Sequence, residues 1–292
     1  MALIRVPATT ATLGPGFDSL GSALTLYAEF SFEYSDSLRI AGCPPEHAGE
    51  DNLVWRAYLA ACRDLGLAET PLSISIRSAI PIARGLGSSA ACAAAGMAAA
   101  WALAGIPLDR ARLLTLCARM EGHPDNAAAA VLGGLRASFI DGASVYSLEA
   151  PLHPSLRFLA LIPDFELSTE EARRALPGTV PITDAVYNIS RAASLPLALA
   201  AGDGAAIRAA CRDRLHQPWR FPLIPGAAEL ALAMEEAGAA ACFLSGAGPT
   251  LMCVYADAAF PDRAGAVLRA GFPRFRALPL MLCREGLAVL PG

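Results

Sequence analysis

The amino-acid sequence predicts an α+β protein built from about two domains. Candidate strands and helices alternate along the chain, but without the strict strand–helix–strand rhythm of a parallel sheet. The chain has 292 residues, which favours two domains of ordinary size. Hydrophobic residues make up 54% of the sequence and charged residues 17%, a composition typical of a well-buried globular core.

In the first half, β-branched and aromatic residues mark the strands, and capped apolar runs mark the helices. Strands are expected over residues 2–6, 22–40, 72–79, 134–140 and 144–149. Helices are expected over residues 52–65, 90–105 and 109–120, the last of them behind Asp109 as its N-cap. Glycine-rich turns separate several of these segments.

In the second half, the proline-bearing segment 150–157 (APLHPSLR) predicts a junction between domains at residues 1–152 and 153–292. Helices are expected over residues 168–176, 184–201, 203–215 and 224–238. Strands are expected over 157–165 and on both sides of the turn within 241–256, and the tail reads as a helix followed by a strand.

The overall composition excludes several classes of function. The net charge is −4 with no basic block, so nucleic-acid binding has little electrostatic support. No apolar run reaches the ~18 residues of a membrane span, and we expect no secretory signal. The eight cysteines include no C-x-x-C pair, which favours reduced thiols in a cytoplasmic protein and argues against a zinc site.

The sequence contains no lysine, so all 23 of its basic residues are arginine. This excludes Schiff-base chemistry and a lysine nucleophile. It also excludes the lysine-bearing phosphate loop, G-x-x-x-x-G-K-[ST].

The stretch 81–91 (PIARGLGSSAA) joins a glycine turn to the start of a helix. Unpaired backbone N–H groups and the helix dipole make such a place suitable for a phosphate. The alternative is a serine cap on a tightly packed alanine helix, and this stretch alone leaves both open.

Three other stretches have equally simple structural explanations. Residues 245–252 (SGAGPTLM) fit a hairpin turn, residues 12–21 (TLGPGFDSLG) fit a loop that holds Asp18 in an Asx turn, and residues 121–126 (EGHPDN) fit a solvated polar loop. Four stretches suited to anions or metal in one chain nevertheless favour a binding site.

These motifs resemble those of the GHMP kinases, which phosphorylate small molecules. PIARGLGSSAA is similar to their nucleotide-binding motif, EGHPDN to their middle motif and SGAGPT to their third. Within that superfamily the chain resembles the homoserine kinase family. The similar segments are VPATTATLGPGFDSLG at 6–21, NLVWRA at 52–57, DAVYNISRAA at 184–193 and DRLHQPWR at 213–220.

The resemblance implies a two-domain GHMP kinase fold, with an N-terminal domain similar to ribosomal protein S5 domain 2 and a ferredoxin-like C-terminal domain. It implies transfer of the γ-phosphoryl group of ATP to the hydroxyl of L-homoserine, in threonine biosynthesis. ATP and Mg²⁺ would be required, the expected assembly is a homodimer, and no nucleic acid or membrane would take part.

The resemblance also assigns residues. The residues implied to bind the nucleotide are Asn52, Pro81, Ile82, Ala83, Arg84, Gly85, Leu86, Gly87, Ser88, Ser89, Ala90 and Ala91. Those implied to hold Mg²⁺ are Ser88, Ser89 and Glu121, because oxygen ligands suit a hard cation. Those implied to bind the substrate are Thr12, Asp18, Thr169, Arg173, Arg220 and Gly246.

Within these sets, Asp18 would bind the substrate ammonium, and Arg173 and Arg220 would clamp its carboxylate. The implied catalytic residues are Glu121, His123 and Asn126, with the last two orienting the reacting hydroxyl. Phosphoryl transfer depends mainly on such positioning and on charge neutralisation.

Thr12 departs from the family pattern, which reads S-A-N-L-G-P-G-F-D where this chain has TATLGPGFD. Threonine is shorter than asparagine and lacks its amide. Either the substrate is positioned differently, or activity or specificity is altered. A GHMP kinase for another small alcohol, or a non-catalytic nucleotide-binding relative, therefore remains open.

Overall fold

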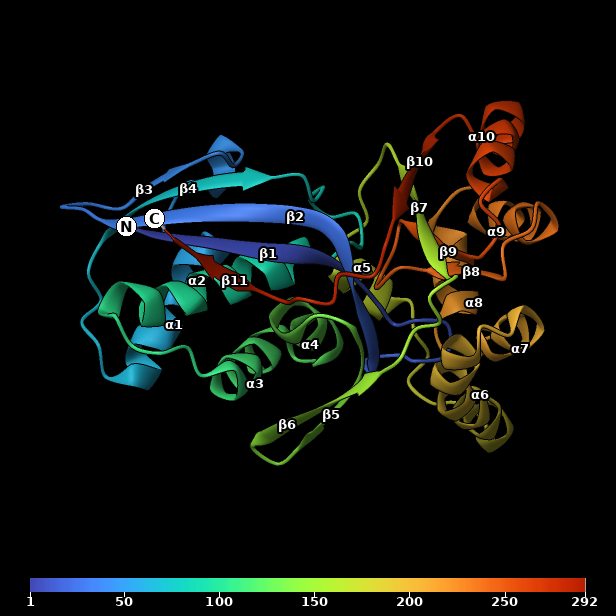
Figure 1. The fold of residues 1–292 in the computed structure, drawn as a ribbon, viewed down its shortest axis with the longest axis horizontal. Helices are drawn as coiled ribbons and strands as arrows, with labels where there is room; N and C mark the ends of the chain where they lie inside the picture. Colours follow the sequence, from blue (N-terminus) through green and yellow to red (C-terminus); the bar gives the residue numbers. More distant parts are fainter. Residues whose placement is uncertain (292) are drawn as a thin grey trace.

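The computed structural model describes residues 1–291, which form two β-sheets with helices packed on their faces (Figure 1). The first sheet has the strand order β11-β1-β2-β4-β3, and the β5–β6 hairpin is attached to β2. Its strands are β1 (Ala2–Ala11), β2 (Leu20–Tyr34), β3 (Arg39–Ala41), β4 (Leu72–Ser78), β5 (Leu135–Asp141), β6 (Ser144–Ala150) and β11 (Ala288–Leu290).

One face of the first sheet is covered by helices (Figure 1). They are α1 (Leu53–Leu65), α2 (Ser88–Ala104), α3 (Arg110–Glu121) and α4 (Asp125–Leu132). Helix α2 is buried on nearly all sides, which explains its small residues. A Cβ on Gly96 would lie 2.1 Å from the carbonyl oxygen of Val54, so α1 and α2 approach each other closely.

The second sheet has the strand order β10-β7-β9-β8. Its strands are β7 (Arg157–Pro163), β8 (Ala241–Leu244), β9 (Leu251–Tyr255) and β10 (Phe275–Leu280). Neighbouring strands are antiparallel, and helices connect β7 to β8 and β9 to β10. This connectivity is the β-α-β-β-α-β pattern of a ferredoxin-like domain, as predicted.

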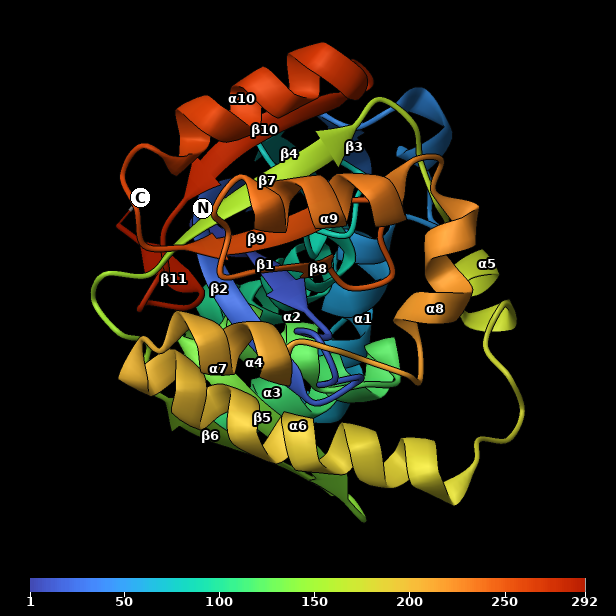
Figure 2. The same cartoon turned by 90° about the vertical axis from the view of Figure 1, so that its right-hand side faces the viewer.

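Helices lie on both faces of the second sheet (Figure 2). Helices α9 (Ala227–Glu236) and α10 (Phe260–Gly271) cover the outer face, while α6 (Ile182–Ala201) and α7 (Gly204–Ala210) lie on the inner side. Alternate residues of β7 therefore enter different cores: Phe158 joins the large core shared with the first sheet, and Leu159 joins the outer core.

Three predicted elements are wrong by five or more residues at one end. The strand expected over 2–6 continues to Ala11 as β1, because residues 7–11 also pair with β2. The strand expected over 22–40 ends at Tyr34, and the chain turns before the short strand β3, which pairs in parallel with β4. The helix expected over 203–215 ends at Ala210, because the carboxylate of Asp213 accepts backbone N–H groups of the following residues and forms a turn. Short helices α5 (Thr169–Arg174) and α8 (Gln217–Arg220) flank the region between the sheets.

Strand β11 returns to the first sheet and pairs with β1, so both ends of the chain lie close together (Figure 1). We keep the division into residues 1–152 and 153–292 as a proposal, with β11 as a segment of the second range that pairs within the first sheet. No helix among residues 1–291 is long and apolar enough to cross a membrane.

Candidate active site

The glycine-serine stretch forms the mouth of helix α2. Gly85 and Gly87 both have φ of 72°, which carries the chain sharply into the helix at Ser88. The first backbone N–H groups of an α-helix have no partner within the helix. Here they lie at a cavity of about 300 Å³ that Gly87, Ser88 and Ser89 line. The mouth of α2 is therefore available to an anion.

The second glycine turn packs directly against this mouth. The hydroxyl of Ser245 donates a hydrogen bond of 2.6 Å to the carbonyl oxygen of Gly85. The backbone N–H of Gly246 donates to the carbonyl oxygen of Ala11 at 2.8 Å. A Cβ on Gly85 would lie 2.3 Å from the Ser245 carbonyl oxygen, so only glycine fits there. Loops from the two halves of the chain thus share one wall of the cavity.

Backbone strain is concentrated at this cavity. Within residues 1–291, the non-glycine residues with positive φ are Thr12 (59°), Asp18 (52°) and Ala83 (52°), and all three line it. A left-handed backbone costs a non-glycine residue roughly 1–2 kcal/mol. Such conformations persist where the surroundings impose them, which is common at functional sites.

Asp18 and Arg173 form a two-point ion pair at the cavity. Arg173 Nη2 donates to Asp18 Oδ1 at 2.7 Å, and Nη1 donates to Oδ2 at 3.1 Å. Arg173 lies in α5, and Asp18 lies in the loop between β1 and β2. The sequence motifs predicted both residues at one site, and the fold brings them into direct contact.

Arg220 is buried, with only 2% of its surface exposed, yet it lines the same cavity. Its guanidinium donates to the carbonyl oxygens of Ala172 and Gly246, and it forms no ion pair with any residue in the range 1–291. Burial, and then the nearby charge of Arg173, lower the pKa of Arg220 to about 10. A buried cation without a carboxylate partner is unfavourable, so this position favours an incoming anion.

Glu121, the last residue of α3, lines the same cavity and contacts the mouth of α2. Its Oε1 accepts a hydrogen bond of 2.5 Å from the hydroxyl of Ser89. Burial raises the pKa of Glu121, although the bond from Ser89 and the charge of His123 oppose this. A cation beside these oxygen atoms would stabilise the carboxylate, so the donor set fits a hard divalent ion.

His123 and Asn126 line the cavity next to Glu121. His123 Nδ1 lies 2.7 Å from Asp125 Oδ1, and Asn126 Oδ1 accepts a hydrogen bond of 2.5 Å from Thr9. Burial opposes a charge on His123, but the hydrogen bond to Asp125 and the surrounding carboxylates outweigh it and raise its pKa. Both residues are thereby fixed in orientation.

Asp125 was not among the predicted site residues, although it lies inside the EGHPDN motif. It is buried, accepts from the Thr12 hydroxyl at 3.4 Å, and is bonded to His123. Ligand atoms of Asp18, His123 and Asp125 lie within 4.8 Å of one another, and a cation could also be held there. Arg173, which forms an ion pair with Asp18, already supplies positive charge at that place.

A second, largely apolar cavity of about 400 Å³ adjoins the first. Ala83, Ser88, Ser89 and Thr169 line both cavities. Asn52, Ile82 and Ala91, three predicted nucleotide residues, line the second one. Its remaining wall includes residues that no motif indicated: Cys43, His47, Ile76 and Cys92.

Two predicted nucleotide residues lie outside both cavities, and a third has a structural role. Leu86 is buried in the core, and Pro81 lines a separate surface pocket. Asn52 caps α1, since its side chain accepts from Val54 N at 2.9 Å and donates to His47 O at 2.6 Å. The other predicted site residues line one or both of the adjoining cavities.

Comparison with known proteins agrees with the family resemblance that the sequence motifs indicated. Residues 52–134 match the family model of the GHMP kinases N terminal domain, and residues 197–274 match that of the GHMP kinases C terminal domain. The chain is 39% identical to the homoserine kinase of Clostridium beijerinckii, covering 100% of this chain and 99% of that one. It is 43% identical to the homoserine kinase of Thermus thermophilus, covering 99% and 95%.

Among solved structures, the chain is similar to the homoserine kinase from Cytophaga hutchinsonii. The TM-score is 0.87 at 27% sequence identity, with 99% of this chain and 97% of that chain covered.

Proposed function

The chain belongs to the homoserine kinases of the GHMP kinase family, and from this premise we propose that it transfers the γ-phosphoryl group of ATP to the hydroxyl of L-homoserine. The product would be O-phospho-L-homoserine, an intermediate of threonine biosynthesis. The two-domain α+β fold and the use of ATP follow from the family itself.

One observation carries the choice of substrate: Arg220 is buried without a carboxylate partner among residues 1–291, at the wall of a polar cavity. A substrate carboxylate would supply the missing negative charge. An alcohol without a carboxylate, such as a neutral sugar, would leave the guanidinium unpaired.

The Asp18–Arg173 pair supports an amino acid in particular. A carboxylate and a guanidinium in contact can each receive one half of a zwitterion, with the ammonium on Asp18 and the carboxylate between Arg173 and Arg220. Thr12, Thr169 and Gly246 line the same cavity and would complete the substrate pocket.

The adjoining cavities support the placement of the nucleotide. The apolar cavity would take the base, with Asn52, Ile82 and Ala91 at its wall. The triphosphate would then reach Gly85, Gly87, Ser88 and Ser89 at the mouth of α2. Arg84 lines the polar cavity and adds positive charge near that point.

We propose Ser88, Ser89 and Glu121 as the residues that hold Mg²⁺, on the strength of their oxygen donors and the raised pKa of Glu121. The bound ion would neutralise charge on the phosphate oxygens. His123, fixed by Asp125, and Asn126, fixed by Thr9, would orient the substrate hydroxyl towards the phosphate.

We also propose a homodimer in the cytosol, formed through α6 and the β5–β6 hairpin. Along Ile182–Ala201 no exposed residue is charged, and Leu197 is 72% exposed. The exposed residues of α6 are Ile182, Thr183, Val186, Ile189, Ser190, Ala193, Ser194, Leu197 and Ala201. The hairpin adds the exposed side chains of Phe139, Tyr146 and Leu148 on one face, and both elements lie at the lower side in Figures 1 and 2.

A second copy fits this surface better than a charged partner does. A two-fold interface brings the same surface of both copies together, so an apolar surface without exposed charges on its helix complements itself. The helix, about 30 Å long, and the hairpin offer a footprint on the order of 500 Å² per copy. Specific interfaces begin near 600 Å² per partner, so the surface of α6 and the hairpin is close to the area that a specific dimer needs.

The proposed activity is tested by coupled ADP release with L-homoserine, mevalonate and sugars as acceptors. Turnover with L-homoserine alone is the expected result. Turnover with another alcohol would mean a different GHMP kinase, and nucleotide binding without turnover on any acceptor would mean a non-catalytic relative.

A further inference from the structure

His216 is a buried histidine, 1% exposed, that belongs to neither cavity. Its Nε2 lies 2.7 Å from the carbonyl oxygen of Gly14, and since a carbonyl can only accept, Nε2 carries the proton. Its Nδ1 is buried with no hydrogen-bond partner in the described part of the chain. Burial lowers the pKa of His216 and outweighs the charge of Asp213, so the ring is neutral with its single proton on Nε2.

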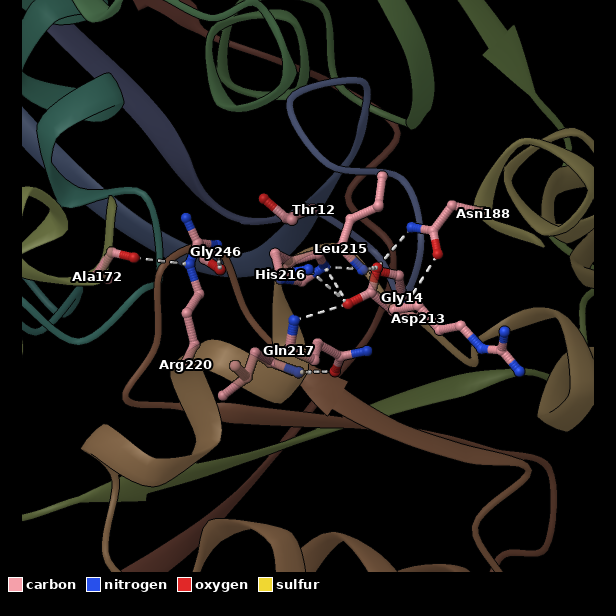
Figure 3. A network of polar contacts seen from close by, with 12 residues as sticks. Thr12, Gly14, Ala172, Asn188, Asp213, Leu215, His216, Gln217, Arg220 and Gly246 are labelled. Carbon is pink, nitrogen blue, oxygen red and sulfur yellow. Dashed lines mark hydrogen bonds and ion pairs between the residues drawn. The ribbon is translucent and has the colours of Figure 1, made fainter. Parts of the chain in front are cut away.

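The segment around His216 is held from several sides (Figure 3). Asp213 accepts hydrogen bonds from the backbone N–H groups of Leu215, His216 and Gln217, and from the side chain of Asn188 in α6. Gln217 in turn accepts from the backbone N–H of Leu244 in β8. The start of α8 is therefore fixed on the second sheet and on α6.

The other end of the His216 contact is the loop between β1 and β2. This loop carries Thr12 and Asp18, both of which line the polar cavity with positive φ. The ring of Phe17 stacks on the ring of His216, with centroids 5.4 Å apart. The guanidinium groups of Arg220 and Arg173 lie over the same Phe17 ring, 5.0 and 5.4 Å from its centroid.

His216 is thus the hydrogen-bonded link between the element that ends in Arg220 and the loop that carries Asp18. We propose that His216 is a positioning residue that sets the spacing between Asp18 and Arg220, and so selects acceptors that carry both an ammonium and a carboxylate. The inference rests on the proposed function, because it concerns how that same pocket recognises its substrate.

Two matched variants separate the hydrogen bond from the ring. His216→Gln can keep a donor near the position of Nε2, whereas His216→Phe keeps the stacked ring and loses the donor. A neutral hydrogen bond contributes about 1 kcal/mol, so we expect His216→Phe to raise the KM for L-homoserine by roughly 3- to 10-fold. His216→Gln should restore much of this, and the KM for ATP should stay within about twofold in both.

The decisive readout is discrimination against 4-hydroxybutyrate, which is homoserine without its ammonium. In wild type, kcat/KM should be higher for L-homoserine than for 4-hydroxybutyrate. The ratio of the two values should be smaller in His216→Phe, because Asp18 is then no longer held in place. An equal loss for both acceptors, or a rise in the KM for ATP, would overturn the proposal. The control is His153→Gln, a histidine outside both cavities that is bonded to Ser155.

A measurement without substrate keeps this test separate from the proposed activity. Hydrogen exchange of the amides in residues 13–19 should be faster in His216→Phe than in wild type and close to wild type in His216→Gln. Exchange in β1 and β2 should not change. If His216→Phe does not fold, His216→Asn replaces it, because its shorter amide does not reach the Gly14 carbonyl. Unchanged exchange in the loop would disprove the positioning role even if homoserine is the substrate.

Discussion

Arg173 holds Asp18 by two parallel hydrogen bonds, of 2.7 and 3.1 Å, across the boundary between the two halves of the chain. Each group is held in orientation by the other. In the proposed binding mode, an amino acid would replace this one pair by two, with its ammonium on Asp18 and its carboxylate on the arginines. Both charged ends of the substrate would then be needed to compensate for separating the pair.

Replacing Arg220 by methionine should impair binding of the acceptor without affecting the nucleotide. A hydrogen bond to a charged group contributes about 1.5–3 kcal/mol, so the KM for L-homoserine should rise roughly 10- to 100-fold. The KM for ATP should stay within about twofold. Steady-state kinetics with each substrate varied checks this.

The control for Arg220 is Arg214→Met, which removes an exposed arginine of the same segment paired with Asp184. It should leave both KM values unchanged. A selective defect in ATP binding in Arg220→Met would place this residue at the nucleotide instead of the acceptor.

Glu121→Gln should lower kcat by about 10²-fold or more, because the variant loses a carboxylate that would hold the Mg²⁺ ion, and this ion would neutralise charge in the transition state. It should also make the protein more stable at pH 7. A carboxyl whose pKa is raised on folding destabilises the folded state above that pKa, and the penalty disappears below the unfolded value near 4.5. The stability gain of the variant should therefore shrink as the pH falls through this window.

Thermal unfolding from pH 8 to pH 4, with and without Mg²⁺, measures both effects. Mg²⁺ should stabilise wild type more than Glu121→Gln, since the ion removes the cost of the buried carboxylate. The control is Glu149→Gln, an exposed carboxyl on β6. Equal stabilisation of all three proteins by Mg²⁺ would show that Glu121 does not bind the metal ion.

Thr12→Asn should stabilise the protein. Thr12 has φ of 59°, and a β-branched residue tolerates this left-handed conformation poorly, whereas asparagine adopts it readily. A gain of about 1 kcal/mol would raise Tm by roughly 2–4 °C. Thr12→Ala removes the branch but lacks the local hydrogen bonding that lets asparagine adopt this conformation, so it should raise Tm less than Thr12→Asn does. A lower Tm in Thr12→Asn would contradict the argument.

The same variant tests the open question about the acceptor. Asparagine is the residue of the family pattern at this position, so a lower KM for L-homoserine in Thr12→Asn would show that threonine weakens binding. An unchanged KM would show that this chain places the acceptor without help from the residue at position 12.

Ile189→Arg should convert the proposed dimer into a monomer, because each copy would have to bury an unpaired charge in the apolar face of α6. Light scattering coupled to size exclusion should report the mass of a dimer for wild type and half that mass for the variant. Leu232→Arg, an exposed leucine on α9, should leave the mass unchanged. A monomeric wild type would disprove the dimer.

The sequence predicted much of this arrangement because its signals were local. Asp109 was expected to cap a helix, and it accepts backbone N–H groups of Ala111 and Arg112. The glycine turn and its serines were expected at a helix mouth, and they are found there. Such features depend on a few neighbouring residues, so one sequence is enough to find them.

The contacts that the sequence did not reveal join distant segments. The bond from His216 to Gly14 spans 202 positions, and Asp125 receives the hydroxyl of Thr12 across 113. Nothing in a short stretch encodes such a partner. Likewise, the sequence assigned Asn52 to nucleotide binding, and only the fold shows that it caps α1 through its bonds to Val54 and His47.

Strand β11 has a consequence for how the protein forms during synthesis. The edge of β1 remains without its neighbour until residues 288–290 have left the ribosome, and Arg110 meanwhile lacks the Leu287 carbonyl to which it donates at 2.7 Å. The first sheet, most of which is synthesised early, is thus completed only when β11 pairs with β1. This pairing closes a loop that includes nearly all of the chain. Loop closure of this span is slow, so a nascent chain halted after the junction would expose a bare strand edge to chaperones or to other nascent chains.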